Sequence, residues 1–128
     1  MRKILERDYE EIQKAFVTRC LKSVIILCGG AIEAILLDLL QQKQSAVLAA
    51  TKAPKGKTDI TRWDLVDLIN VSVEIGLVSN GVEKLSHSVR DYRNLIHPGN
   101  EVRNKLTFNT EEARIAIEVL NMVHRDCS

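Results

Sequence analysis

Residues 24–40 read VIILCGGAIEAILLDLL and form the most apolar run in this chain of 128 residues. Apolar side chains cover most of the circumference of a helix drawn through this run, as expected of a central helix that neighbours contact from several sides. The positions concerned are Ile25, Leu27, Ile32, Ile35, Leu36 and Leu39. The run is short for a membrane span, and Glu33 and Asp38 are costly in hydrocarbon. We therefore predict a long buried helix over about residues 18–44 and no membrane partner.

Gly29 and Gly30 lie in the middle of this predicted helix. Each glycine there costs a helix roughly 1 kcal/mol relative to alanine. Such a cost is tolerated where another element must approach the helix backbone closely. The pair therefore predicts a tightly crossing neighbour.

Working outward, four further segments have helical periodicity, and no alternating strand pattern of useful length is present. Their expected ranges are 4–16, 61–78, 80–97 and a last helix that starts after Asn109. Helix-start signals precede the last three, and Pro98 with Gly99 ends the fourth. Residues 53–60, with Pro54 and Gly56, are expected to form a loop. The prediction is an all-α, five-helix, bundle-like fold with a long apolar second helix.

Composition agrees with one small helical domain over residues 1–128. Hydrophobic residues make up 45% of the chain and aromatic residues 4%, a balance typical of bundles packed with aliphatic side chains. A length of 128 residues suffices for one core without disulfides or a structural metal. The formal net charge is only +1, so a nucleic acid would have to be held by a local patch rather than by the overall field.

The cysteines and other soft ligands show no pattern of a metal or cofactor site. Cys20, Cys28 and Cys127 are odd in number and lack CxxC spacing, and the chain does not begin with a secretory leader. A reduced, cytoplasmic setting is expected. No His, Cys or carboxylate spacing indicates a metal site, and no glycine-rich phosphate loop is present. We expect neither a metal nor a cofactor.

The predicted fourth helix separates an apolar stripe from a polar face. At about 100° per residue the stripe contains Val82, Leu85, Val89, Tyr92 and Ile96. The opposite side carries His87, Arg90, Arg93, Asn94 and His97. Histidine exchanges protons near neutral pH, and arginine offers a charged fork that matches phosphate oxygens. Cleavage of RNA by its own 2′-hydroxyl requires both functions, so this face is the candidate site.

The segment VRDYRNLIHP, residues 89–98, resembles the RX4-6H motif of the HEPN superfamily, helical domains that recur in RNA-cleaving toxins and prokaryotic defence systems. Six residues separate Arg90 from His97, which fits the motif, and Asp91 is the polar residue common after its arginine. Arg93 with Asn94 resembles the frequent Arg-Asn form, but only three residues separate Arg93 from His97. The motif alone leaves the catalytic arginine ambiguous.

This resemblance implies a homodimer whose motif-bearing helix ends share a cleft, with metal-independent endoribonuclease activity in active members. The implied site residues are Arg90, Arg93, Asn94 and His97, with Tyr92 supporting them from the core side. Other members of the superfamily are non-catalytic binding or dimerisation modules that contact a protein partner of the same system. The function is thus either RNA cleavage or binding in a toxin or defence system, or helical protein interaction.

Glu33 and the loop lysines can each be interpreted in two ways. Glu33 on the apolar helix either pairs with Arg90 or Arg93 across the crossing or is solvated or caps a helix. The lysines at positions 52, 55 and 57 either contact nucleic-acid phosphate or lie in a solvated loop, and the second interpretation is favoured. Arginine, asparagine and histidine at a helix end also commonly bind the last free carbonyls.

Overall fold

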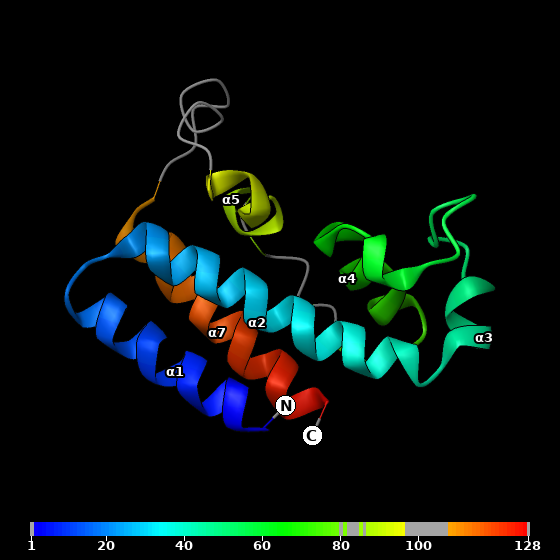
Figure 1. The fold of residues 1–128 in the computed structure, drawn as a ribbon, viewed down its shortest axis with the longest axis horizontal. Helices are drawn as coiled ribbons and strands as arrows, with labels where there is room; N and C mark the ends of the chain where they lie inside the picture. Colours follow the sequence, from blue (N-terminus) through cyan, green and yellow to red (C-terminus); the bar gives the residue numbers. More distant parts are fainter. Residues whose placement is uncertain (1, 80, 82–84, 86, 97–107, 128) are drawn as a thin grey trace.

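The computed structural model describes residues 2–79, 81, 85, 87–96 and 108–127, and these residues form helices and connections without a strand. The all-α prediction is therefore confirmed, as is the long apolar second helix, but the described residues form six α-helices where five were predicted. Three long helices, α1 (Arg2–Val17), α2 (Leu21–Gln41) and α7 (Thr110–Asp126), run side by side in Figure 1. Their facing surfaces are fully buried at Ile12, Ile25, Leu36, Leu120 and Val123.

The turn between α1 and α2 interrupts the expected start of the second helix. Arg19 adopts a left-handed conformation with φ 61°, and the Cys20 amide donates to the carbonyl of Ala15 at 2.8 Å. These bonds close the end of α1, so α2 begins at Leu21 rather than near residue 18. At its other end α2 stops at Gln41, and Gln44–Leu48 forms a separate short helix, α3.

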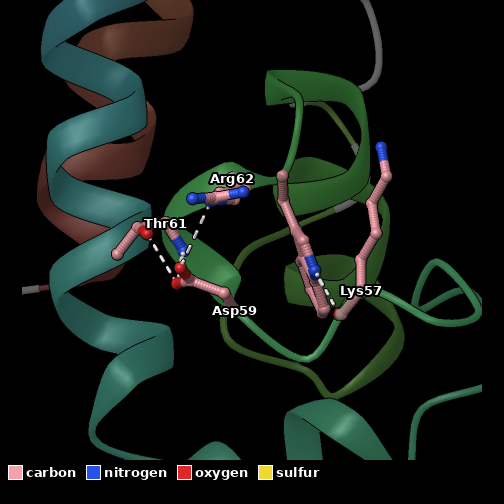
Figure 2. A network of polar contacts seen from close by, with 5 residues as sticks. Lys57, Asp59, Thr61 and Arg62 are labelled. Atoms are coloured by element: carbon pink, nitrogen blue, oxygen red, sulfur yellow. Dashed lines mark hydrogen bonds and ion pairs between the residues drawn. The ribbon is translucent and has the colours of Figure 1, made fainter.

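The segment that leads into α4 (Leu65–Glu74) is shaped by a polar network, shown in Figure 2. Asp59 accepts hydrogen bonds from the amide and hydroxyl of Thr61 and pairs with Arg62, which holds a short 3₁₀ turn, η1 (Ile60–Arg62). The buried Trp63 then donates its indole N–H to the Lys57 carbonyl at 2.9 Å. The helix predicted to start at Thr61 therefore starts four residues later, at Leu65, because Asp59 caps the 3₁₀ turn that contains Thr61.

A glycine ends α4 earlier than expected. Gly76 has φ +79°, its amide donates to Val73, and the Leu77 amide donates to the Ser72 carbonyl at 2.9 Å. This pair of bonds is the Schellman arrangement, which favours glycine at the left-handed position. The helix predicted to run to residue 78 therefore ends at Glu74.

The expected continuous helix over 80–97 was wrong for the part of the segment that the structure describes. An α-helical turn, α5 (His87–Arg90), is followed by a turn at Asp91 and a 3₁₀ helix, η3 (Tyr92–Ile96). A 3₁₀ helix places residues three apart on one face, and Leu95 is accordingly fully buried beside the half-buried Tyr92. Leu85 and Val89 are buried as predicted.

Several of the predicted positions in this segment lie outside the described residues. They are Asn80, Val82, Glu83, His97, Pro98 and Gly99, and the side chains of His87 and Ile96 are not described either.

The last helix starts where the sequence predicts. The side chain of Asn109 accepts a hydrogen bond from the Glu112 amide at 2.7 Å, which caps α7. Figure 1 shows α7 along one side of α2, whereas α4 and α5 lie on the other side of it. By length and composition α2 could cross a membrane, a property it shares with the buried central helix of many globular domains.

Candidate functional site

The close approach predicted at the glycine pair is made by Tyr92. A Cβ atom added at Gly29 would lie 2.5 Å from Cγ and Cδ1 of Tyr92, whereas one added at Gly30 would lie 3.8 Å from the nearest ring atom. Only Gly29 is therefore required by the packing. The element that crosses α2 here is the 3₁₀ helix η3, not a long helix.

Glu33, one turn further along α2, holds the same element by polar contacts. Its carboxylate accepts a hydrogen bond from the Tyr92 hydroxyl and forms an ion pair with Arg93. Burial raises the pKa of Tyr92, so the phenol remains a donor throughout the physiological range. The Glu33 side chain is only 14% exposed, against 47% for Arg93. Of the two partners considered for Glu33, the structure shows Arg93.

Arg90, Asp91, Tyr92, Arg93 and Asn94 line one hollow on the surface. The opposite wall is the start of α4 with the residue before it, formed by Asp64, Leu65 and Val66. The volume is about 420 Å³. The structure thus brings together three of the four predicted catalytic residues and the supporting Asp91 and Tyr92. His97, the fourth, follows η3 in sequence and lies outside the described residues.

The polar residues of this hollow differ in position. Arg93 is paired with Glu33, and the Asn94 side-chain amide donates to the carboxylate of Asp91. Arg90 borders both this hollow and a second one of about 270 Å³, which is lined also by Lys52, Val66, Ile69 and Asn70. Arg90 and Arg93 are therefore not equivalent: the first lies where two hollows meet, and the second is tied to the core helix.

The contribution of α4 was missed at the sequence level. Val66 and Asp64 lie more than twenty residues from Arg90 in sequence, and no motif links them. Val66 is one of four exposed large apolar side chains among the described residues, with 38% of its surface exposed.

The start of α4 adds to the electrostatics of the hollow. The side chain of Asp64 makes no hydrogen bond to the first turn of α4, and a helix N-terminus attracts anions. The hollow thus offers two guanidinium groups and a positive helix end, but Asp64 and Asp91 balance the two guanidinium charges and Arg93 is also paired with Glu33. Among the described residues, no group of three or more His, Cys, Asp or Glu is placed to hold a metal ion.

Comparison of the chain with protein-family models, with curated proteins and with solved structures finds no match. The function must therefore be argued from the residues and their geometry.

Proposed function

We propose that this chain is an RNA-directed, HEPN-like domain that cleaves single-stranded RNA without a metal. The observation that carries the proposal is the position of Arg90, which lines an open hollow together with Arg93, Asn94 and the start of α4. Guanidinium groups and a helix N-terminus both favour phosphate oxygens. The motif-like spacing from Arg90 to His97 supplies the link to RNA chemistry.

The proposed reaction is an internal transesterification. The 2′-hydroxyl loses its proton and attacks the adjacent phosphorus, and the bond to the 5′-oxygen breaks as that oxygen gains a proton. The products are a 2′,3′-cyclic phosphate and a 5′-hydroxyl. In this scheme Arg90 stabilises the added charge on the phosphorane-like transition state, and His97 transfers a proton to or from an oxygen.

The geometry favours separate roles for the two arginines. The Glu33 carboxylate pairs with Arg93 and also accepts the hydrogen bond of the Tyr92 hydroxyl, so it holds two residues of η3. We assign Arg93, Tyr92 and Glu33 to positioning of the site and Arg90 to contact with phosphate. Asn94 is bonded to Asp91, and this pair fixes the turn between α5 and η3.

The deciding experiment is cleavage of labelled single-stranded RNA in the presence of chelator, with analysis of the RNA ends. We expect 2′,3′-cyclic phosphate ends from the parent protein and none from Arg90→Ala or His97→Ala. Arg114→Ala is the matched control, because Arg114 is exposed on α7 and does not line the hollow. Because Arg90 is half-buried, thermal melting of Arg90→Ala accompanies the assay, and a variant that melts near the parent temperature but does not cleave separates loss of chemistry from loss of fold.

A second candidate function is a non-catalytic helical interaction module. One observation favours it: Arg93, Tyr92 and Asn94 all have partners inside the chain, as structural residues do. If varied RNAs remain uncut and unbound, while Arg90→Ala dissociates a dimer or a co-purifying protein, this candidate replaces the first. RNA binding without cleavage would make the domain a reader of RNA.

We also propose that the chain acts as a homodimer, in a cytoplasmic toxin or defence system. The resemblance to the superfamily supports this assembly. In addition, Ile26, Leu27 and Leu37 of α2 are only partly buried within one chain. Sedimentation at micromolar concentration tests the assembly, and a strict monomer would contradict it.

A further inference from the structure

The second hollow, next to the candidate site, has a distinct charge. Its lining contains two cations, Lys52 and Arg90, the amide side chain of Asn70 and the apolar side chains of Val66 and Ile69. No carboxylate is among these lining residues. The first hollow, by contrast, sets Asp64 and Asp91 against its two arginines. The second hollow therefore has the more positive lining. Arg90 is the one residue of the RX4-6H-like segment among its lining residues.

Lys52 is held at this hollow by its backbone. The Glu74 carboxylate, at the end of α4, accepts hydrogen bonds from the Thr51 amide at 2.7 Å, the Thr51 hydroxyl at 3.0 Å and the Lys52 amide at 2.9 Å. These bonds fasten the chain after α3 to α4. They fix the start of the Lys52 side chain, which is exposed, and the charge of Lys52 also contributes to the lowered pKa of the nearby Glu74 carboxyl.

Val66 and Arg90 line both hollows, so the two hollows are adjacent, and we refer to the pair as the groove. The exposed apolar side chain of Val66 lines both hollows and suits a nucleotide, because the ribose or base can contact it while phosphates meet the cations of the same lining. A single strand can extend in this way, since its bases are not stacked inside a duplex.

We propose that the Lys52–Arg90 hollow is a phosphate subsite that binds the backbone of single-stranded RNA next to the phosphate held in the first hollow. This inference rests on the proposed function, because it takes RNA as the ligand of the groove. It assigns Lys52 to RNA binding and, of the three loop lysines, only Lys52. Lys55 and Lys57 line a different hollow, formed with Pro54 and Gly56.

The test is the affinity of the full chain for a short oligouridylate with 2′-O-methyl groups, which binds but cannot be cleaved. Lys52→Gln should weaken binding by on the order of tenfold, the equivalent of one charged hydrogen bond. The slope of log affinity against log salt should also decrease by about 0.7, the value for one phosphate contact on a single strand. Lys52→Arg should retain most of the affinity and slope.

The matched control is Lys55→Gln, which removes the same charge from the same loop. It should leave affinity and salt slope close to those of the parent protein. Equal losses in Lys52→Gln and Lys55→Gln would overturn the subsite, because Lys52 would then act only through the general field. In that outcome, a loss of RNA binding in Arg90→Ala would still support the proposed function, although the subsite at Lys52 would be wrong. If the parent protein binds no RNA at a low salt concentration, both proposals fail.

Discussion

The two sides of α2 are built differently. On one side α1 and α7 are regular helices of 16 and 17 residues, packed through fully buried aliphatic side chains such as Ile12 and Leu120. On the other side α5 and η3 have four and five residues. There Glu33 and Glu74 bridge segments that are far apart in sequence. The regular side supplies apolar burial, and the irregular side, with its carboxylate bridges, carries the candidate site.

The largest effect is expected at Gly29, where the two sides meet. Gly29→Ala places a methyl group against the ring and Cβ of Tyr92 and should destabilise the chain by about 1–3 kcal/mol, as other overpacked contacts do. Gly30→Ala is the matched control. Its added Cβ meets only ordinary contact, so it should gain up to about 1 kcal/mol of helix propensity. Thermal and denaturant unfolding of the two variants measures this difference.

Hydrogen exchange would show which side of α2 is affected by Gly29→Ala. We expect faster exchange in α5 and η3, with protection in α7 largely retained. Uniform loss of protection across the chain would contradict a separation between the two sides.

A smaller effect is expected from the polar anchor of η3. Glu33→Ala removes the acceptor of the Tyr92 hydroxyl and the partner of Arg93, and should cost about 1–2 kcal/mol. Arg93→Ala should cost only about 0.5 kcal/mol, because the guanidinium is 47% exposed and solvent weakens the pair. The double variant then gives the coupling between Glu33 and Arg93. Equal losses in both single variants would contradict an anchor dominated by Tyr92.

On the regular side, the turn at Arg19 offers a modest gain. Its φ of 61° is unfavourable for a side chain with a Cβ atom. Arg19→Gly should raise the free energy of unfolding by up to about 1 kcal/mol, because relief of this strain outweighs the extra backbone freedom of glycine in the unfolded chain. A decrease in the denaturant midpoint would show that the Arg19 side chain itself contributes more than the turn costs.

The smallest effect concerns pH and involves one carboxyl on each side of α2, Glu74 in α4 and Asp126 at the end of α7. Hydrogen bonds from the amides of Thr51 and Lys52 lower the pKa of Glu74, and a bond from the Ser79 amide lowers that of Asp126. A carboxyl with a lowered pKa in the folded state stabilises the protein above its unfolded pKa of about 4. That contribution is lost as the pH falls through the folded pKa. Stability should therefore fall in acid, and less steeply in Glu74→Gln, as measured by melting between about pH 6 and pH 3.

The sequence predicted the regular side well and the irregular side poorly. Repeated apolar spacing and the cap at Asn109 are local signals, and they located α2 and α7. The break at Asp91 was not predicted, because a helical wheel assumes a constant angle per residue and the 3₁₀ geometry of η3 changes it. The left-handed turn at Arg19 carries no glycine to mark it, whereas Gly76 was a usable signal that the apolar periodicity beyond it obscured.

The candidate site divides in the same way. Its motif residues lie in one segment of eight residues, Arg90 to His97, and could be named from the sequence, as could Glu33 as a partner of an arginine. Val66 could not, and Lys52 was named only with Lys55 and Lys57, for which a solvated loop was favoured. The packing of α4 and the hydrogen bonds of Glu74 place Val66 and Lys52 at the groove. Local chemistry is readable along the chain, but the opposite wall of a groove depends on tertiary contacts.

The packing of α7 along α2 also has a consequence for synthesis on the ribosome. About seventy residues separate the end of α2 from the start of α7. At about 5–20 residues per second, the faces of α2 that α7 covers remain open for several seconds after α2 is made. During that interval the nascent chain displays the most apolar segment of the protein. The apolar surface of α2 is therefore buried only when the last helix has been made. A ribosome that stalls before Thr110 leaves an aggregation-prone intermediate that needs chaperones.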